Sequence, residues 1–279
     1  MKLKAYAKIN LFLEVIKRRT NGYHEIDTVF QTVSLFDELT FKPRKDGKVV
    51  LRCSDNNLAV GQTNLVIKAA CALKNASART LGASIYLKKN IPLGAGLGGG
   101  SSDAAATLKG LVKLWKLKVS YKRLHAIAAT LGADVPFFLT GGTARGRGIG
   151  DKLTAITGVE NAYFVLVNPD FPVATRWVYN NLHSPLTNRR KIDTILKVLR
   201  RNPSFWGECL FNRLEEVVVP VFSEISKIRS VLTKIGCPSL MSGSGSTVFA
   251  LAGSAKDARR IRRLMAGHSW KSWVVKSVQ

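Results

Sequence analysis

The chain has 279 residues, long enough for two modest domains or one large one with an ample core. Hydrophobic residues make up 46% of it, and no apolar run approaches the roughly 20 residues that a membrane-spanning helix needs, so composition excludes a helical integral membrane protein. Its 43 Lys and Arg residues against 18 Asp and Glu residues give a net charge of +25. Such a charge attracts anionic ligands, but we interpret it first as a basic composition with no function attached.

In the first half of the chain, hydrophobic periodicity predicts short strands interleaved with helices. A turn at Asn21 and Gly22 separates the first two strands, and Ser120 is placed to cap a helix that runs to Leu131. The predicted strands are 2–16, 26–33, 39–42, 48–53 and 83–88, and the predicted helices are 64–77, a segment that begins at Ser101, and 120–131.

The second half follows a glycine-punctuated run at 141–150, which we interpret as the boundary between a domain at 1–150 and a domain at 151–279. Strands and helices are intermixed without the regular rhythm of a doubly wound sheet, so we predict an α+β fold. Beyond the boundary the predicted strands are 162–167, 246–252 and 271–276, and the predicted helices are 175–182, 189–201, 221–235 and 255–266.

A glycine-rich loop lies between the predicted strand at 83–88 and the helix that begins at Ser101. Five glycines occur within the nine residues 92–100. Glycine backbone can turn several N–H groups toward one point, and a helix behind such a loop adds unpaired N–H groups and the positive end of its dipole. Glycine runs also form linkers and tight turns, but a linker is not usually framed by a strand and a helix. The loop therefore predicts a phosphate-binding site.

Two common phosphate-binding motifs do not fit this loop. A P-loop needs Gly-Lys followed by Ser or Thr, and the chain contains neither sequence. Gly94, Gly96 and Gly99 match the spacing of the dinucleotide fingerprint, but that fold needs an acidic residue about 20 positions later. No Asp or Glu occurs between Asp103 and Asp134. Neither P-loop nor Rossmann chemistry is predicted.

Two short segments near the N-terminus carry polar groups in a regular pattern. Lys8 and Asn10 alternate with apolar residues, which places both on one face of a strand; a solvated edge strand explains this equally well. Tyr23 and His24 directly follow the turn at Gly22, where a plain hairpin end is the alternative.

Two further segments lie later in the chain. Asp134 is a single carboxylate among apolar residues, which would be costly unless a cation meets it. It is interpreted either as a structural cap or salt bridge, or as a catalytic base held by a lysine. The run 241–247 is a second loop of small residues between strands. It is either a hairpin turn or a second backbone approach to a ligand.

These segments, in this order and spacing, resemble the GHMP kinase superfamily from about residue 3 to about residue 252. The phosphate loop is typical of the superfamily. The Lys8/Asn10 and Tyr23/His24 segments are similar to those of members that act on a cytidylyl substrate. The segments that carry the resemblance are 7–11, 22–24, 92–102, 132–136 and 242–246.

The resemblance implies a two-domain GHMP kinase fold. Its N-terminal domain would bind ATP and be similar to domain 2 of ribosomal protein S5, its C-terminal domain would be ferredoxin-like, and the active site would lie in the cleft between them. The implied reaction is ATP-dependent phosphorylation of the 2-hydroxyl of 4-diphosphocytidyl-2-C-methyl-D-erythritol, in the methylerythritol phosphate pathway to isoprenoids. The products would be the 2-phosphate and ADP.

The resemblance also implies roles for individual residues. Asp134 would be the base on the hydroxyl, with Lys8 beside it to keep the carboxylate ionised and to neutralise charge on the transferred group. Tyr23 would stack on cytosine and His24 would hydrogen-bond to it, with Tyr179 on the other face and Trp177 as second choice. The implied ATP-binding residues are Asn64, Lys89, Pro92, Leu93, Gly94, Ala95, Gly96, Leu97, Gly98, Gly99, Gly100, Ser101 and Ser102, and the implied substrate-binding residues are Asn10, Tyr23, His24, Thr175, Tyr179, Gly243 and Ser244.

Phosphoryl transfer implies Mg²⁺ as a cofactor of ATP. Apart from Asp134 and Asp103, the predicted site contains no obvious acidic ligand, so the sequence leaves the metal ligands open; a hydroxyl of Ser101 or Ser102 is one option. The four cysteines and four histidines are scattered, which predicts free thiols and gives a zinc site little support.

Two other functions remain open at this stage. A relative that phosphorylates homoserine, mevalonate or a sugar would keep the same loops. A nucleic-acid-binding module would explain the charge, but the basic residues are spread along the chain without a recognised motif, so we expect no specific nucleic acid. We also expect no membrane partner and a cytoplasmic location, since residues 1–8 have no signal-peptide core. The oligomeric state, monomer or dimer, is not predicted.

Overall fold

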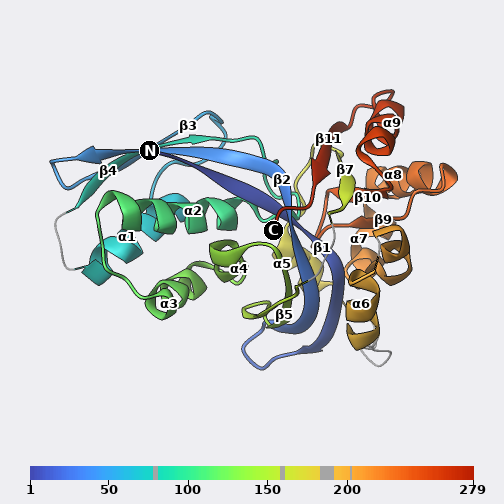
Figure 1. The fold of residues 1–279 in the computed structure, drawn as a ribbon, viewed down its shortest axis with the longest axis horizontal. Coiled ribbons are helices and arrows are strands. Elements are labelled where there is room, and N and C mark those ends of the chain that lie inside the picture. Colours follow the sequence, from blue (N-terminus) through green and yellow to red (C-terminus); the bar gives the residue numbers. More distant parts are fainter. Residues whose placement is uncertain (78–80, 158–160, 183–191, 202) are drawn as a thin grey trace. The chain divides into compact units, whose positions relative to one another are not determined.

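The computed structural model describes residues 1–77, 81–157, 161–182, 192–201 and 203–279 (Figure 1). These residues form two compact units, neither of which is one continuous stretch of chain. The first comprises Met1–Ala7, Leu35–Ile91 and Gly98–Thr140, and the second comprises Lys8–Ser34, Pro92–Leu97 and Gly141–Gln279. The domain boundary at residue 150 stays a prediction, because it divides the chain at one point whereas these units are defined by packing.

Two long strands run through both units, β1 (Lys2–Arg18) and β2 (His24–Arg44). In the first unit, β2 pairs antiparallel with β4 (Gly82–Lys88), from Glu38 opposite Lys88 to Arg44 opposite Gly82. The third strand, β3 (Val49–Cys53), runs parallel to β4. The helices of this unit are α1 (Leu65–Ser77), α2 (Gly99–Leu114), α3 (Tyr121–Leu131) and α4 (Val135–Thr140).

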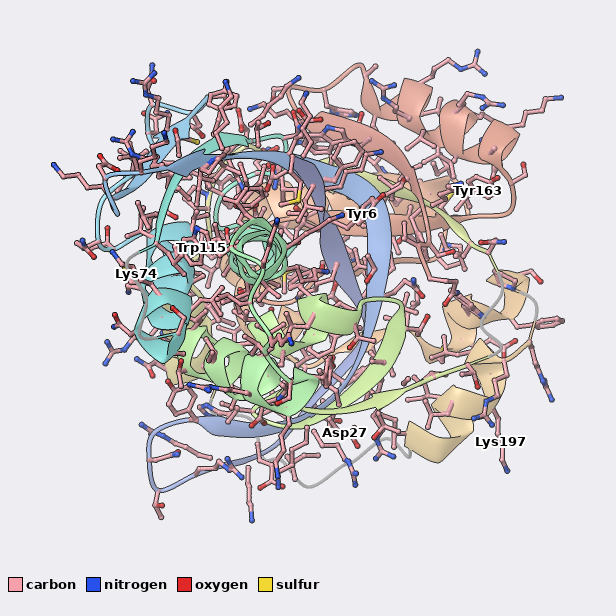
Figure 2. The ribbon with its side chains drawn as sticks, turned by 60° about the vertical axis from the view of Figure 1, so that its left-hand side comes forward. Tyr6, Asp27, Lys74, Trp115, Tyr163 and Lys197 are labelled. Carbon is pink, nitrogen blue, oxygen red and sulfur yellow. The ribbon has the colours of Figure 1, made fainter. Side chains whose placement is uncertain are left out.

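Helix α2 lies close to the sheet because of its small residues. A Cβ atom at Gly110 would come within 2.7 Å of the ring of Phe41 on β2, closer than packed atoms tolerate. Trp115, which follows the helix and is labelled in Figure 2, donates a 3.1 Å hydrogen bond from Nε1 to the carbonyl of Gly82. The cap predicted at Ser120 is confirmed, since its Oγ accepts the N–H of Arg123 at 3.3 Å.

The second unit contains two groups of strands. In one, β5 (Thr143–Gly148) pairs antiparallel with β2 and with β6 (Lys152–Ala155), and β8 (Phe211–Asn212) runs parallel to β1. The other is a four-stranded sheet of β7 (Tyr163–Asn168), β9 (Ser239–Met241), β10 (Val248–Ala252) and β11 (Lys271–Lys276). The helical segments are α5 (Thr175–Asn180), α6 (Ile192–Leu199), the 3₁₀ helix η1 (Pro203–Cys209), α7 (Glu215–Val221), α8 (Ser223–Lys234) and α9 (Ala255–Met265).

The four-stranded sheet has the ferredoxin-like arrangement that the resemblance implied. Its order is β11-β7-β10-β9, and all neighbours are antiparallel. One face packs on α8 and α9 through a shared core that contains Val165 and Ala250. The opposite face carries Phe164 and Phe249; the ring of Phe164 packs with Trp206 of η1 and edge-on with Phe249. Since both faces are covered, β7 and β10 are nearly continuous apolar runs. The α+β fold is confirmed.

Several elements differ from the sequence predictions. The strands predicted at 26–33 and 39–42 are parts of the single strand β2, and the run 141–150 contains strand β5. There Gly146 lies against Phe30, whose ring would be 2.6 Å from an added Cβ atom, so a glycine-rich run can serve as a strand. The helix predicted at 221–235 corresponds to α8, and a separate short helix, α7, precedes it. The elements without a prediction are α4, β5, β6, η1, β8, α7 and β9. The predicted helix at 189–201 corresponds to α6, with 189–191 outside the described residues.

Candidate active site

The first half of the glycine loop lies in the second unit and is held by backbone contacts. The carbonyls of Gly94 and Ala95 accept the N–H groups of Val173 at 3.0 Å and Thr247 at 3.2 Å. Gly96 has φ +75°, and an added Cβ atom would lie 2.0 Å from the carbonyl oxygen of Ser242. The two glycine-rich loops therefore contact each other directly, and Gly96 is required for their packing.

The second half of the loop lies in the first unit and begins α2. Gly98 adopts the left-handed conformation, with φ 68° and ψ 20°, and caps the helix without a side chain. Ser102 is buried, and its Oγ donates to the carbonyl of Tyr6 at 2.7 Å. Gly100 is exposed, and an added Cβ atom would meet Leu65 at an ordinary 3.5 Å. The first N–H groups of a helix have no partner within it, so this end is suited to an anion.

Lys8 and Asn10 belong to a chain of buried hydrogen bonds in the second unit. The Lys8 ammonium donates to Oδ1 of Asn10 at 2.5 Å and to the carbonyl of Gly96 at 3.1 Å. Nδ2 of Asn10 donates to Oγ1 of Thr28 at 2.8 Å, and that hydroxyl donates to the carbonyl of Phe12 at 2.6 Å. The alternation predicted for Lys8 and Asn10 thus places both inside the protein, and the alternative of a solvated edge strand is wrong.

The second loop of small residues is also held near Lys8. An added Cβ atom at Gly243 would lie 3.3 Å from Nζ of Lys8 and 3.4 Å from Oδ1 of Asn10. Asn212, on the short strand β8, donates from Nδ2 to the carbonyls of Met241 and Gly243 at 2.8 and 2.7 Å. Asn212, Thr28 and Asp37 were not among the residues predicted for the site, although each makes buried polar contacts near it or near the glycine loop. Each is a polar residue within an apolar segment, which is the one sequence signal that could have identified it.

The predicted cytosine-binding residues lie together in the second unit. The ring of His24 stacks on Tyr179 of α5, with centroids 5.1 Å apart and planes 29° apart. Burial lowers the pKa of His24, and the positive charge of Arg18 lowers it further. Tyr23 is 59% exposed. Trp177, the second choice, packs edge-on against Phe222.

Two other predicted substrate residues are joined by a hydrogen bond. The hydroxyls of Thr175 and Ser244 lie 2.8 Å apart, which connects α5 to the second glycine-rich loop. Asp134 belongs to the first unit, where it is partly buried in the turn before α4. Because Lys8 belongs to the second unit, the predicted pairing of Lys8 with Asp134 stays a prediction.

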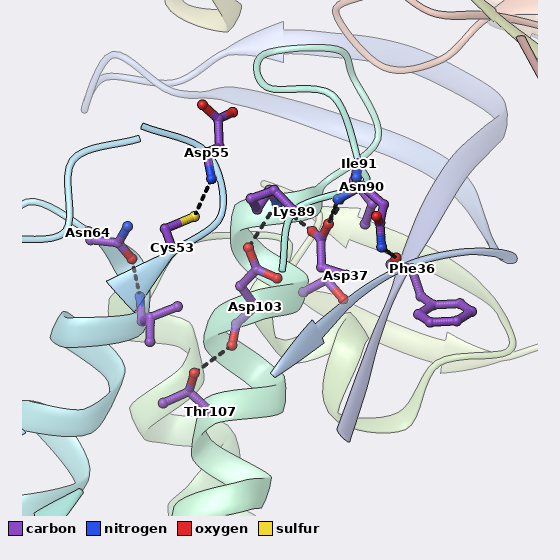
Figure 3. Close-up of polar contacts among 12 residues, drawn as sticks. Phe36, Asp37, Cys53, Asp55, Asn64, Lys89, Asn90, Ile91, Asp103 and Thr107 are labelled. Carbon is purple, nitrogen blue, oxygen red and sulfur yellow. Dashed lines mark hydrogen bonds and ion pairs between the residues drawn. The ribbon is translucent and has the colours of Figure 1, made fainter. Parts of the chain in front are cut away.

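Asn64 and Lys89 have structural partners in the first unit (Figure 3). Asn64 caps α1, with Oδ1 accepting the N–H of Val66 at 2.8 Å. Lys89 forms ion pairs with Asp37 and, at 3.0 Å, with Asp103. We call these three charged residues, Asp37, Lys89 and Asp103, the loop clamp. The predicted contacts of Asn64 and Lys89 with ATP stay predictions.

Metal ligands were left open by the sequence, and the described residues contain no group of three or more His, Cys, Asp or Glu side chains that could hold a metal ion. Asp103, one of the two acids considered, is 2% exposed and paired with Lys89. All four cysteines are free thiols, as predicted. Among the helices that the structure describes, none is long and apolar enough to cross a membrane.

Comparison with known families covers both halves of the chain. Residues 64–142 match the family model described as GHMP kinases N terminal domain, and residues 187–268 match the model described as GHMP kinases C terminal.

Individual relatives match along nearly the whole chain. The 4-diphosphocytidyl-2-C-methyl-D-erythritol kinase of Syntrophus aciditrophicus is 41% identical, covering 100% of this chain and 99% of the relative. The enzyme of the same name from Geobacter sulfurreducens is 42% identical, covering 99% and 98%. A crystal structure of 4-(cytidine 5'-diphospho)-2C-methyl-D-erythritol kinase superimposes with a TM-score of 0.84 at 37% identity and covers both chains fully. The mevalonate kinase of Methanococcus jannaschii has a TM-score of 0.75 at 14% identity, which shows the shared fold alone.

Proposed function

The chain belongs to the GHMP kinase family, and from this premise we propose that it phosphorylates 4-diphosphocytidyl-2-C-methyl-D-erythritol with ATP. The observation that carries this function is the identity of about two fifths, along the whole chain, to kinases that bear this substrate's name. The acceptor is the 2-hydroxyl, and the products are the 2-phosphate and ADP. The enzyme thus acts in the methylerythritol phosphate pathway to isoprenoid precursors.

ATP binds through its phosphates at the start of α2. This proposal is supported by the first N–H groups of the helix, which have no partner within a helix, and by Gly100, where an added Cβ atom would meet only Leu65 at an ordinary 3.5 Å. Gly94 and Gly96 have a different task, because their backbone packs on the segments around Pro172 and Ser242. In this proposal Gly100 therefore approaches the phosphates, whereas Gly94 and Gly96 hold the loop in place and Gly99 packs against Ile91 and Lys89.

Asp134 and Lys8 carry out the chemical step. The hydroxyl oxygen attacks the γ-phosphorus, the bond from that phosphorus to the bridging oxygen of ADP breaks, and the hydroxyl proton passes to the Asp134 carboxylate. General-base help of this kind accelerates reactions by about 10² to 10⁴. The Lys8 ammonium, oriented by Asn10 and by the Gly96 carbonyl, stabilises negative charge on the transferred group.

The cytosine ring binds at Tyr23 and His24. The lowered pKa of His24, caused by burial and then by Arg18, keeps the imidazole neutral near pH 7. A neutral imidazole has one donor and one acceptor nitrogen, which suits a base edge that presents both an amino group and ring acceptors. Tyr179 stacks on His24 and holds the ring that reads the base.

Mg²⁺ accompanies ATP in this proposal and neutralises charge on its phosphates. Mg²⁺ commonly keeps several waters and takes only one or two protein ligands beside phosphate oxygens. Ser101, in the first turn of α2, supplies a candidate hydroxyl for such an ion, whereas the hydroxyl of Ser102 donates to the carbonyl of Tyr6.

The remaining parts of the proposal concern location and partners. A cytoplasmic location and the absence of a specific nucleic-acid partner stay predictions. The net charge of +25 favours attraction of the anionic nucleotide substrates at low salt.

Phosphate transfer to a panel of alcohols tests the function. The purified protein is incubated with γ-labelled ATP, Mg²⁺ and, separately, 4-diphosphocytidyl-2-C-methyl-D-erythritol, mevalonate, homoserine or galactose. Label is expected to enter the cytidylyl substrate with a kcat/KM at least about 10³-fold above the others, because a site built for a base leaves its polar groups unpaired when the base is missing. Equal or faster transfer to another alcohol would show that the family is right and the substrate wrong.

A further inference from the structure

The loop clamp joins the two segments of the first unit that flank the glycine loop (Figure 3). Before the loop, Oδ1 of Asp37 accepts the N–H groups of Asn90 at 2.6 Å and Ile91 at 2.9 Å. After the loop, Asp103 lies on α2 just beyond its first turn. Lys89 binds a carboxylate on each side. One ammonium thus connects the strand that leads to the loop with the helix that leaves it.

The stability of the fold does not by itself account for this cluster. All three charged side chains are almost fully buried, with side-chain exposures of 4% for Lys89, 0% for Asp37 and 3% for Asp103. Burying an ion costs several kcal/mol, and apolar residues of similar volume often give equal or greater stability. A set of three buried charges therefore points to a geometric requirement at this place.

We propose that the loop clamp positions the glycine loop for the phosphates of ATP, with Asp37 as the positioning residue that holds Lys89 and the two N–H groups before the loop. This inference rests on the proposed ATP-binding function. Asp37 acts through Lys89 and Ile91, which it holds, and not by contact with the reacting atoms.

The contact that transmits the effect is at Gly99. An added Cβ atom there would lie 3.0 Å from Cγ2 of Ile91 and 3.2 Å from Nζ of Lys89. Both groups that Asp37 holds are therefore packed against the first residue of α2. If Asp37 releases them, the start of the helix loses the support that fixes its N–H groups, and those groups are the proposed phosphate donors.

Because the loop clamp has one carboxylate more than it has ammonium groups, the charge of Asp37 can be removed by substitution while the protein still folds. The cluster has two carboxylates for one ammonium, and Oδ1 of Asp103 is buried without a hydrogen-bond partner. Burial raises the pKa of Asp103 to about 7; Lys89 opposes the rise and Asp37 adds to it. In Asp37→Asn, Lys89 and Asp103 remain as a one-to-one pair and the amide oxygen can still accept the two N–H groups, so the variant removes only the ion pair that holds Lys89 against Gly99.

Asp37→Asn is compared with wild type by calorimetric ATP binding and by steady-state kinetics for both substrates. The dissociation constant and KM for ATP are expected to rise about tenfold, the effect of weakening one oriented interaction by about 1.4 kcal/mol. The KM for the cytidylyl substrate is expected to stay unchanged. A change of both KM values together would indicate general damage.

Glu14→Gln is the matched control, because it also neutralises a buried carboxylate in an ion pair. Glu14 is 2% exposed and binds Arg213 at 2.7 and 3.0 Å, and it lies on β1 in the second unit. The thermal stability of Glu14→Gln is expected to fall, while the ATP affinity of this variant stays at the wild-type value.

The pH dependence of ATP binding separates positioning from a purely structural role. The charged groups that face Asp103 are Lys89 and Asp37, with the thiol of Cys53 nearby. As pH rises through about 7, Asp103 ionises and adds negative charge behind the phosphate site, so wild-type ATP affinity is expected to fall. In Asp37→Asn the like charge is gone, so the midpoint of this change is expected to move to lower pH.

The outcomes distinguish this inference from the function on which it rests. If Asp37→Asn binds ATP as tightly as wild type, or is weakened no more than Glu14→Gln, the clamp has no positioning role while the kinase function stands. If the wild-type protein neither binds nor uses ATP, both fall.

Discussion

The ammonium of Lys8 and the amide oxygen of Asn10 are 2.5 Å apart, and both side chains are buried in the second unit. The orientation of this amide is determined by Thr28. Its hydroxyl gives its proton to the carbonyl of Phe12, so towards Asn10 it can only accept, and the amide nitrogen must face it. The amide oxygen is thereby directed to Lys8.

Thr28→Val is expected to misplace Lys8, because the amide of Asn10 loses the acceptor that orients it. We expect kcat to fall about tenfold or more, the equivalent of at least about 1.4 kcal/mol, with KM for ATP nearly unchanged. Leaving Nδ2 unpaired also costs about 1–3 kcal/mol of stability. Thr28→Ser keeps the hydroxyl and should retain most of the activity in the same assay. Equal activity of both variants would remove this role from Thr28.

Asp134→Asn is expected to lower kcat by about 10² to 10⁴, the range for loss of a general base, because an amide cannot take the hydroxyl proton. ATP binding, measured separately by calorimetry, should persist, since the carboxylate acts on the acceptor. A variant that turns over at the wild-type rate would show that another group is the base.

Two alanine substitutions separate the glycines that pack from those that approach ATP. Gly96→Ala places Cβ 2.0 Å from the Ser242 carbonyl at a φ of +75°, so we expect a loss of about 3 kcal/mol or more in thermal unfolding. Gly100→Ala has room in the protein and should fold normally, with a gain of up to about 1 kcal/mol from helix propensity. Its ATP affinity should nevertheless fall. Unchanged affinity in Gly100→Ala would place the phosphates elsewhere.

Tyr179→Ala is expected to raise the KM for the cytidylyl substrate, because His24 loses its stacked support. A stacked pair of aromatic rings contributes about 0.5–1.5 kcal/mol, which corresponds to roughly 2- to 13-fold. Trp177→Ala on the same helix removes an aromatic ring that packs on Phe222, and it should cost stability while leaving this KM unchanged. If Trp177→Ala raises the KM more than Tyr179→Ala does, the second choice for the cytosine site is the right one.

Asp103→Asn is expected to change how stability depends on pH. In the folded protein the pKa of Asp103 is raised by burial, against the opposing charge of Lys89 and with that of Asp37, from 3.8 to about 7. The native state therefore binds the proton more tightly than the unfolded chain, so wild-type stability falls between pH 4 and 7, by at most about 1.4 kcal/mol per pH unit. The stability of Asp103→Asn relative to wild type should rise over this window and level off above it. A difference that is flat with pH would show that Asp103 titrates normally.

Local patterns predicted much of the fold. Alternation located the strand that became β1, apolar runs located β4 and β7, and the hydroxyl at Ser120 marked the start of α3. Prediction failed where a distant neighbour overrode the local signal. Val33, Leu35, Leu39 and Phe41 alternate along β2 and are buried, and Asp37 occupies the buried position between them. The strand can continue through this charged residue because Lys89 neutralises it.

The sequence by itself determined the family, the α+β class and the position of the glycine loop, because short motifs and periodicity depend on neighbours in the chain. Only the tertiary structure decided which glycines of that loop pack and which remain open. An added Cβ atom at Gly96 would collide with Ser242, which is far away in sequence, whereas one at Gly100 would meet only Leu65 at an ordinary distance. The same holds for Thr28, Asp37 and Asn212. Each acts through partners that folding brings within hydrogen-bond distance, and no local pattern records such a distance.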